Sequence, residues 1–435
     1  MLDEIQNFLS LEYWQNFLKS PTKKRLAENF FSLSILQGLN YILPLITLPY
    51  LVRVLGVEKF GLIAFAQAFL GYFVIIVTYG FDLLAPREIS IFKENKKKVS
   101  EIFSVVIISK IILAIASFFL LLAIVFLVPK FKLFLFFYLL MFEIVIWSVI
   151  FPVWFFQGIE KMKFITIIAF LSKFITVIFI FILIKKPSDY ILYPVVDFIG
   201  NIIAGIWAGK IIFKDFKIIF SVPSWKTIKQ YLKDGFFIFT ANISISLYNN
   251  SNTFILGLLT NNTLVGYYAA AEKIINAIKG LISPVSTAIY PYISKAMHES
   301  KEKGFAIAKK VLLINSIFFG IIGIIIFLLA PLIVKIVLGP KYLSSIIILR
   351  IFSLIPFIVA INNVLGLQTI PTQGYFSEFS KIFLKGSIVG IVLSIFLTIL
   401  FKHIGMAFAW VIAEIFVVIL MIHFHKKKNT LLLFF

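Results

Sequence analysis

The sequence predicts an all-α polytopic membrane protein of about 12 transmembrane helices in two pseudo-symmetric six-helix halves. The first observation is composition, because 61% of the 435 residues are hydrophobic and only 14% are charged. The second is a set of apolar runs of ~20 residues, which are long enough to cross the ~30 Å hydrocarbon core of a bilayer. These runs are continuous rather than alternating, so the spans are helices and not barrel strands.

Twelve spans are predicted along the chain, and they divide it into two lobes. Residues 1–28 form a cytoplasmic interfacial helix or tail, because Ile5, Phe8, Leu9 and Trp14 recur at helical spacing. A disordered tail is the alternative. The remaining predicted parts are an N-terminal lobe (29–215), a cytoplasmic linker (216–234), a C-terminal lobe (235–425) and a C-terminal tail (426–435). The spans lie near 29–51, 61–83, 102–128, 133–156, 164–184, 190–209, 235–259, 270–294, 308–334, 343–368, 382–401 and 404–424.

The distribution of lysine and arginine predicts the orientation. The tails and the alternate loops that include 84–100, 210–233 and 295–310 hold 26 of the 41 basic residues. The opposite set of loops holds 10, and Lys273 is counted among them. The positive-inside rule therefore predicts that both termini are cytoplasmic, in a bacterial inner membrane. The net charge of +21 is accounted for by this asymmetry and by attraction to anionic membrane lipids, so no nucleic-acid partner is expected.

The two halves show signs of being copies of one unit. Phe30 and Phe236 are 206 residues apart, and Gly61 and Gly266 are 205 apart, each pair in a similar context. Six spans per half make this a parallel repeat about an axis along the membrane normal, an arrangement in which transporters bind substrate between the halves. Chance similarity between apolar segments is the alternative.

The most specific segment reads LQGLNYILPLITLPYLVRVLGVEKFGLIAFAQAFLGYFVIIVTYGFDLLAPREIS, from Leu36 to Ser90. With WFFQGIEKMKFIT from Trp154, VGYYAAAEKI from Val265, YPYIS from Tyr290 and LGPKY with LRIFSLIP from Leu338 to Pro356, it resembles one family across all the spans. This family is the Wzx-like O-antigen and polysaccharide flippases of the multidrug/oligosaccharidyl-lipid/polysaccharide exporter superfamily. Pro86 and Asn252 depart from its pattern, which usually has Thr and often Asp there, respectively.

This resemblance implies a function and a set of partners. The expected activity is alternating-access transfer of polyprenyl-diphosphate-linked oligosaccharide repeat units from the cytoplasmic to the periplasmic leaflet, for synthesis of an O-antigen-like surface polysaccharide or lipopolysaccharide. A polysaccharide polymerase and chain-length proteins are further partners that it suggests. No cofactor or metal is expected, and coupling to a proton or sodium gradient is left open.

Charged residues inside the spans are the candidates for binding the diphosphate, because a charge there costs ~2.5–3.5 kcal/mol and should face the interior. Ammonium and guanidinium groups bind phosphate reversibly. An internal ion pair with Glu143 is the alternative for Lys173. For Arg53 and Arg87, at the span ends, the alternative is interfacial anchoring or a salt bridge, and Glu88 and Asp82 are local partners for Arg87. The candidates are Lys279, Arg350, Lys173, Arg53 and Arg87.

Two further groups of candidates are polar or acidic. Tyr248, Asn249 and Asn252 form a polar cluster in the seventh span, suited to contacting a glycan, although hydrogen bonding between helices explains an Asn nearly as well. Four carboxyl groups are candidates for ion coupling or internal ion pairs: Glu143, Asp197, Glu272 and Glu414.

Other classes of protein fit less well. A polysaccharide polymerase or ligase would need a large periplasmic loop with catalytic Arg or His, whereas the outward loops here are short. The sequence shows no nucleophile constellation, P-loop or paired catalytic carboxylates, so no catalytic residue is predicted and a transporter is favoured over an enzyme. A cation-coupled multidrug exporter of the same superfamily remains an alternative, for which acidic rather than basic cavity residues are expected.

Overall fold

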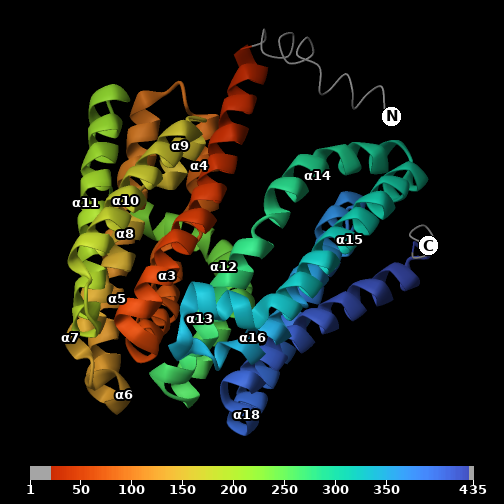
Figure 1. Cartoon of the computed structure of the whole chain (residues 1–435). Helices are drawn as coiled ribbons and strands as arrows, with labels where there is room; N and C mark the ends of the chain where they lie inside the picture. The colour runs from red at the N-terminus through yellow and green to blue at the C-terminus, as the bar shows by residue number, and fades with distance from the viewer. Residues whose placement is uncertain (1–20, 431–435) are drawn as a thin grey trace.

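The structure is a computed structural model that describes residues 21–430, with the side chains of 21–27, 30, 33, 241, 244, 245 and 247–250 outside the described set. All of the regular elements in this range are helical, which confirms the predicted fold class (Figure 1). Residues 1–20 of the predicted interfacial helix or tail (1–28) lie outside the described residues.

The first part of the chain forms one bundle. Its α-helices are α3 (Pro21–Thr78), α4 (Phe81–Ile91), α5 (Lys96–Leu127), α6 (Pro129–Lys132), α7 (Leu135–Met141), α8 (Glu143–Ile150), α9 (Val153–Gly158), α10 (Met162–Leu183) and α11 (Leu192–Lys210). A 3-10 turn, η1 (Pro187–Ile191), precedes α11, and a π-helical turn, η2 (Ile211–Asp215), follows it.

The second part forms the other bundle. Its α-helices are α12 (Trp225–Leu259), α13 (Asn262–Lys279), α14 (Ile282–Glu299), α15 (Lys301–Ile333), α16 (Ser345–Phe352), α17 (Ile355–Asn362) and α18 (Phe376–Lys427). Short turns join them: η3 (Val334–Leu338), η4 (Pro340–Tyr342), η5 (Asn363–Gln368) and η6 (Pro371–Gln373).

Eight helical segments among the described residues are long and apolar enough to cross a membrane. Two of them, α3 and α18, each contain two of the predicted spans. In α3 the chain turns at Gly56, whose φ of 72° favours glycine, and in α18 it turns at Lys402, with a φ of 53°. Figure 1 shows the result for α3, which starts at the upper end, turns at the lower end and returns to α4 at the top. The count of twelve spans and the lobe boundaries stay predictions.

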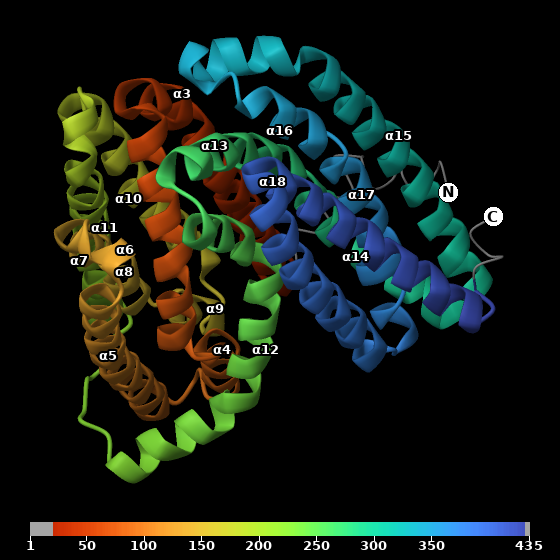
Figure 2. The ribbon, with the colours of Figure 1, turned by 90° about the horizontal axis from the view of Figure 1, so that it is seen from below.

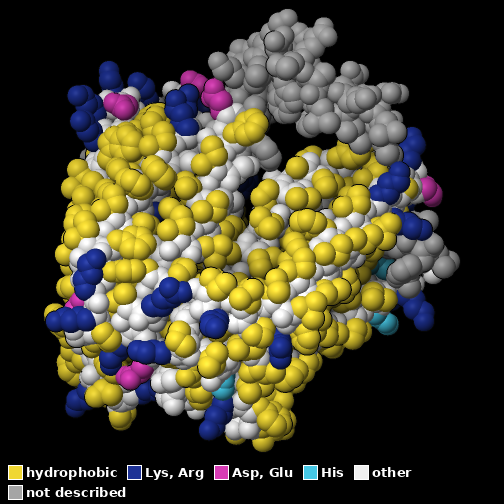
Figure 3. Space-filling model, viewed as in Figure 1, with side chains coloured by type: hydrophobic (Ala, Val, Ile, Leu, Met, Phe, Trp, Pro, Cys, Tyr) yellow, Lys and Arg dark blue, Asp and Glu magenta, His cyan; other side chains and the backbone are white. Residues whose placement is uncertain are grey.

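The two bundles meet at one end and diverge at the other. Figure 2 shows α3 and α13 side by side between them, and α13 packs extensively on α3. In the space-filling view a hollow separates the bundles at the end where α4, α9 and α14 lie (Figure 3). We call this the open end and the opposite end, near α6 and the start of α13, the closed end.

One predicted span differs from the structure in a way that affects the site. The span at 270–294 is divided, because α13 ends at Lys279 and α14 begins at Ile282. The Asn261 side chain caps α13 by accepting a hydrogen bond from the Leu264 backbone N–H at 3.0 Å, so the helix starts well before residue 270. Lys279 therefore lies at a helix end, and Lys273, which was counted in an outward loop, lies inside the helix.

Candidate functional site

The candidate site is a cavity of about 240 Å³ where the two bundles meet. Helices α3, α10 and α11 of the first bundle form most of its wall, and α13 of the second bundle completes it. Leucine, isoleucine and proline side chains line much of the surface, so the polar groups are few and their positions matter. These polar groups are Thr47, Gln67, Lys173, Thr176, Tyr193, Asp197 and Lys273.

Two lysines from different bundles face this cavity. Lys173 on α10 donates a hydrogen bond from Nζ to Asn40 Oδ1 on α3 at 2.6 Å. Lys273 on α13 has no hydrogen-bond or ion-pair partner among the described side chains, although the adjacent Glu272 carboxylate acts on it electrostatically. The two ammonium groups are close enough to repel each other. An anion that binds between them would relieve this repulsion.

Two carboxyl groups lie near the lysines, Asp197 in the cavity wall and Glu143 next to Asp197. Asp197 on α11 accepts a hydrogen bond from Thr176 at 3.2 Å, and Glu143 on α8 accepts one from Asn201 Nδ2 at 3.0 Å. Glu143 is only 4% exposed and its Oε1 meets no donor, while the Asp197 carboxyl is near enough to act on it electrostatically. A single proton shared by the two carboxyl groups would reduce the repulsion between them.

The alternative interpretation of Lys173, an ion pair with Glu143, is not what the structure shows. Among the described residues, the hydrogen-bond partner of Lys173 is Asn40, and the carboxylate that acts on it is Asp197. Gln67 adds a polar contact to the same wall by donating to the Tyr193 hydroxyl at 3.0 Å.

Lys279 and the carboxyl groups of the second bundle lie apart from the cavity wall. The Lys279 ammonium sits over the Trp410 ring, 5.0 Å from its centroid. Glu414 accepts hydrogen bonds from Asn362 Nδ2 at 2.7 Å and from Trp410 Nε1 at 3.3 Å. Glu272 accepts one from Thr253 at 2.7 Å. These contacts join helices to each other within the second bundle.

The polar cluster Tyr248, Asn249 and Asn252 lies on α12, and the structure describes the side chain of Asn252. The side chains of Tyr248 and Asn249 lie outside the described set. Asn252 Oδ1 accepts a hydrogen bond from Ser394 on α18 at 3.2 Å, which is the helix-to-helix contact that was the alternative to glycan binding.

The three arginines are separate from one another. The Arg350 guanidinium packs on the Phe327 ring, 5.5 Å from its centroid, and its Nε is buried without an acceptor among the described atoms. Arg87 is exposed on α4. The local acids proposed as its partners bind elsewhere, because Glu88 accepts from Tyr231 and Asp82 pairs with Lys110 at 3.4 Å.

Arg53 and Lys130 join the two bundles at the closed end. Arg53 Nη2 on α3 donates to the Ile336 backbone carbonyl in η3. Lys130 Nζ on α6 donates to the carbonyls of Leu258 at 3.1 Å and Thr260 at 2.7 Å, at the end of α12. Each cation thus meets carbonyls at the C-terminal end of a helical segment, where the helix dipole favours positive charge. We call Arg53, Lys130 and their carbonyl partners the latch.

Sequence reasoning missed Lys273 and the latch role of Lys130. The sequence did contain a pattern that could have located Lys273. Asn261 precedes a periodic apolar run, which is typical of a helix start, and a helix that begins there contains residue 273 about three turns from its start. For Lys130 no local signal exists, since its partners are 128 and 130 residues away in the chain.

Comparison with known proteins agrees with this architecture. The family model described as "Polysaccharide biosynthesis protein" matches residues 26–297. A "Putative O-antigen transporter" of Escherichia coli (strain K12) is 37% identical over 420 residues, covering 95% of this chain and 99% of the relative. A relative of the same name from Shigella dysenteriae is 29% identical over 402 residues, covering 91% and 99%.

Solved structures show the same fold at low sequence identity. An inward-facing multidrug resistance MATE family transporter of the MOP superfamily matches with a TM-score of 0.71 and 14% identity, over 91% of this chain and 98% of that one. The lipid II flippase MurJ, in an inward closed conformation, matches with a TM-score of 0.67 and 17% identity, over 92% and 89%. These findings confirm the family that the Leu36–Ser90 segment indicated: the chain belongs to the polysaccharide biosynthesis protein family and is a polytopic membrane transporter rather than an enzyme.

Proposed function

We propose that this protein is a flippase that moves polyprenyl-diphosphate-linked oligosaccharide units from the cytoplasmic to the periplasmic leaflet of the bacterial inner membrane. The observation that carries the proposal is the pair Lys173 and Lys273, which face one cavity from two different bundles. A diphosphate bridging these ammonium groups would bind without covalent chemistry and separate again when the bundles move apart. The names of the relatives and of the flippase with the same fold support this substrate class.

The orientation rests on the basic stretches. The stretches 84–100, 157–163 and 295–310 include the C-terminal ends of α4, α9 and α14, at the open end (Figure 1). With positive charge on the inside, the open end faces the cytoplasm, and both termini are cytoplasmic. The substrate headgroup then enters from the cytoplasm, while its lipid tail stays in the bilayer beside the hollow between the bundles.

We also propose that transport is coupled to protons, and the carboxyl pair supports this. When Glu143 and Asp197 share one proton, the remaining negative charge acts on Lys173 and weakens its attraction for phosphate. A second proton removes that charge, so proton uptake and diphosphate binding favour each other by linkage. A sodium ion bound in place of the second proton would also neutralise this negative charge. Varying the pH and the sodium concentration separately distinguishes the two ions.

Two alternatives make different predictions. A multidrug exporter for cations would present a net negative cavity, whereas two lysines and one proton-sharing carboxyl pair give a net positive one. A polymerase or ligase would leave finished lipid-linked units on the outer face of the membrane when deleted. Interaction with a polymerase and chain-length proteins stays a prediction from the resemblance.

The test is complementation of a strain that lacks the gene, with lipid-linked units measured in each leaflet. Lys173→Glu and Lys273→Glu should trap these units in the inner leaflet, because charge reversal repels the diphosphate. Lys335→Glu, at an exposed lysine of η3, is the matched control and should export normally. Membrane levels of each variant, with Lys173→Arg and Lys273→Arg as conservative partners, separate a binding defect from a folding defect. Normal export by both reversed variants would refute the proposal.

A further inference from the structure

The segment that joins the two bundles, residues 214–233, has two unlike sides. Figure 2 shows the chain between α11 and α12 passing round the outer side of α5, at the rim of the molecule. We call residues 214–233 the linker segment.

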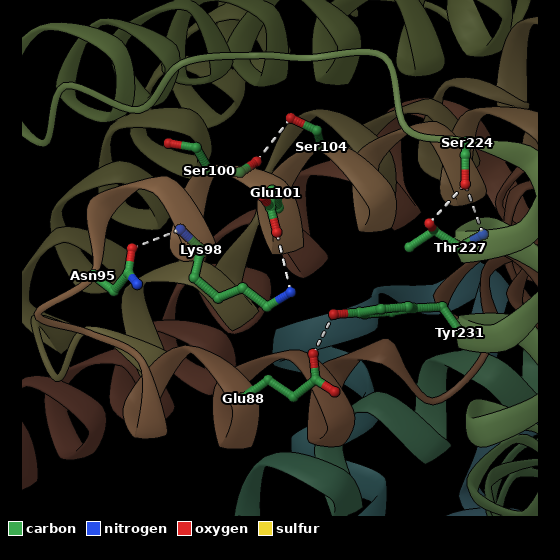
Figure 4. Close-up of polar contacts among 9 residues, drawn as sticks. All are labelled: Glu88, Asn95, Lys98, Ser100, Glu101, Ser104, Ser224, Thr227 and Tyr231. Carbon is green, nitrogen blue, oxygen red and sulfur yellow. Dashed lines mark hydrogen bonds and ion pairs between the residues drawn. The ribbon is translucent and has the colours of Figure 1, made fainter.

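The inner side of the linker segment is attached to the first bundle. Ile218 is buried at 6% exposure, and the backbone N–H groups of Ile219 and Ser221 donate to the hydroxyls of Ser100 and Ser104 on α5 at 3.1 and 3.0 Å. Figure 4 shows both serines and, beside them, the contact from the Tyr231 hydroxyl to the Glu88 carboxylate of α4.

The same close-up shows how α12 begins. Ser224 caps the helix by accepting a hydrogen bond from the Thr227 backbone N–H at 3.2 Å (Figure 4). This cap and the serine contacts fix the direction in which the neighbouring side chains point.

The outer side of the linker segment is apolar and exposed. Ile219 is 74%, Val222 83% and Trp225 64% exposed. Ser100 and Ser104 lie in the first turns of α5, which begins at Lys96 and is itself a candidate membrane span. The linker segment therefore runs at the level where a membrane span meets the interface, a depth at which tryptophan and aliphatic side chains are stable.

The charge of the linker segment is strongly positive. It contains one acidic residue, Asp215. Asp234 lies just beyond its end and accepts a hydrogen bond from Gln230 at 2.8 Å. Its five lysines are all exposed, and none has an ion-pair partner among the described residues: Lys214, Lys217, Lys226, Lys229 and Lys233. Lysines that flank exposed apolar side chains are typical of surfaces that bind anionic lipid.

We infer that the linker segment is a binding surface for anionic phospholipids of the leaflet at the open end. Ile219, Val222 and Trp225 enter the acyl region, and the lysines contact the headgroup phosphates. Because the serine contacts and Glu88 attach this segment to α4 and α5, the bound lipid anchors the first bundle and leaves the second bundle to move against it. This inference is independent of which substrate the cavity binds.

The experiment uses the absence of cysteine from the sequence. Val222→Cys, labelled with an environment-sensitive fluorophore, is reconstituted into vesicles of phosphatidylcholine with or without phosphatidylglycerol. The label should report an apolar environment and should be quenched by a lipid-borne quencher. This quenching should be stronger in vesicles that contain phosphatidylglycerol. Each replacement of Lys226, Lys229 or Lys233 by Gln should weaken binding of the linker segment to phosphatidylglycerol-containing membrane by roughly fivefold, and lipid-borne quenching should fall accordingly.

Glu94→Cys is the control, because it lies in the exposed turn between α4 and α5, flanked by Lys93 and Asn95. Its label should stay accessible to a water-soluble quencher in both vesicle types. The inference is overturned if the label at 222 is as water-accessible as the label at 94. Equal burial with and without phosphatidylglycerol would refute the headgroup contacts, and burial only after addition of a cytosolic extract would assign the surface to a protein partner instead.

Discussion

Gly61 on α3 and Gly266 on α13 lie backbone against backbone at the closed end. A Cβ on Gly61 would lie 2.6 Å from the Gly266 backbone nitrogen and 1.8 Å from the Asn262 carbonyl oxygen. A Cβ on Gly266 would lie 2.1 Å from the Val57 carbonyl oxygen. These are the two glycines that the proposed repeat aligns, 205 residues apart. Residues beside a twofold axis contact their own counterparts, so this pair supports a twofold relationship between the bundles.

The glycine contact makes the first prediction. Gly61→Val and Gly266→Val should prevent α3 and α13 from approaching and so open the closed end, because no side chain fits between these backbones. A single cysteine at Thr260, next to the contact, would then react faster with a membrane-impermeant maleimide. Gly71→Ala is the control on the same helix, since a Cβ there meets nothing within 4 Å. Unchanged reactivity in both valine variants would contradict the proposed packing.

The latch makes the second prediction. Lys130→Gln and Arg53→Gln each remove a charged donor from helix-end carbonyls, and a hydrogen bond to a charged group contributes roughly 1.5–3 kcal/mol. The population with the closed end opened should therefore rise about tenfold or more for each variant. The same maleimide assay measures this shift. Lys132→Gln is the control, because Lys132 is exposed on α6 and has no hydrogen-bond partner among the described residues.

The third prediction concerns pH. If a second proton on the Glu143 and Asp197 pair strengthens anion binding, a short-chain isoprenyl diphosphate should bind more tightly as pH falls. Asp197→Asn combined with Glu143→Gln mimics the pair with both protons bound, so this double variant should bind the diphosphate tightly at all pH values and lose proton-driven transport. Binding titrations of the wild-type protein and the double variant at several pH values check both parts. A pH dependence that survives in the double variant would place the titrating group elsewhere.

The fourth prediction separates Lys279 from the cavity lysines. Lys279→Met keeps an apolar contact with Trp410 and removes only the charge, so export should fall slightly. Lys173→Met removes a cation from the cavity, so export should fall strongly. The measurement is surface polysaccharide in a complemented deletion strain, corrected for membrane level. An equal loss of export in both variants would indicate that Lys279 also contacts the substrate.

The fifth prediction tests a structural role for Glu414. Glu414→Ala removes the carboxylate acceptor of Asn362 and Trp410 and leaves Asn362 only the weaker contact to the backbone carbonyl of residue 414 at 3.4 Å, which should cost about 1–3 kcal/mol of stability. Glu414→Gln keeps an acceptor oxygen and should cost less. Thermal unfolding of the detergent-solubilised protein compares the two. Export that is lost in Glu414→Gln at normal stability would instead indicate a role in coupling.

Composition and hydropathy were enough to predict the class of protein. Hydropathy is a property of each residue summed over ~20 positions, so the apolar runs predicted membrane helices without any knowledge of packing. The turn that divides 29–51 from 61–83 was also predictable, because Gly56 interrupts the run with a residue suited to positive φ. The family segment at Leu36–Ser90 pointed to the family that the comparisons confirmed.

Only the tertiary structure decided which charges share a site. Lys173, Asp197 and Lys273 belong to three helices whose rotations depend on packing against distant partners, so no local pattern shows that they face one cavity. Lys279 satisfied the same sequence criterion as Lys173, yet the end of α13 places it on Trp410. A charged side chain inside a span is stable only when it contacts a polar or aromatic group. The sequence predicts that such a contact exists, but which group makes it depends on how the helices pack.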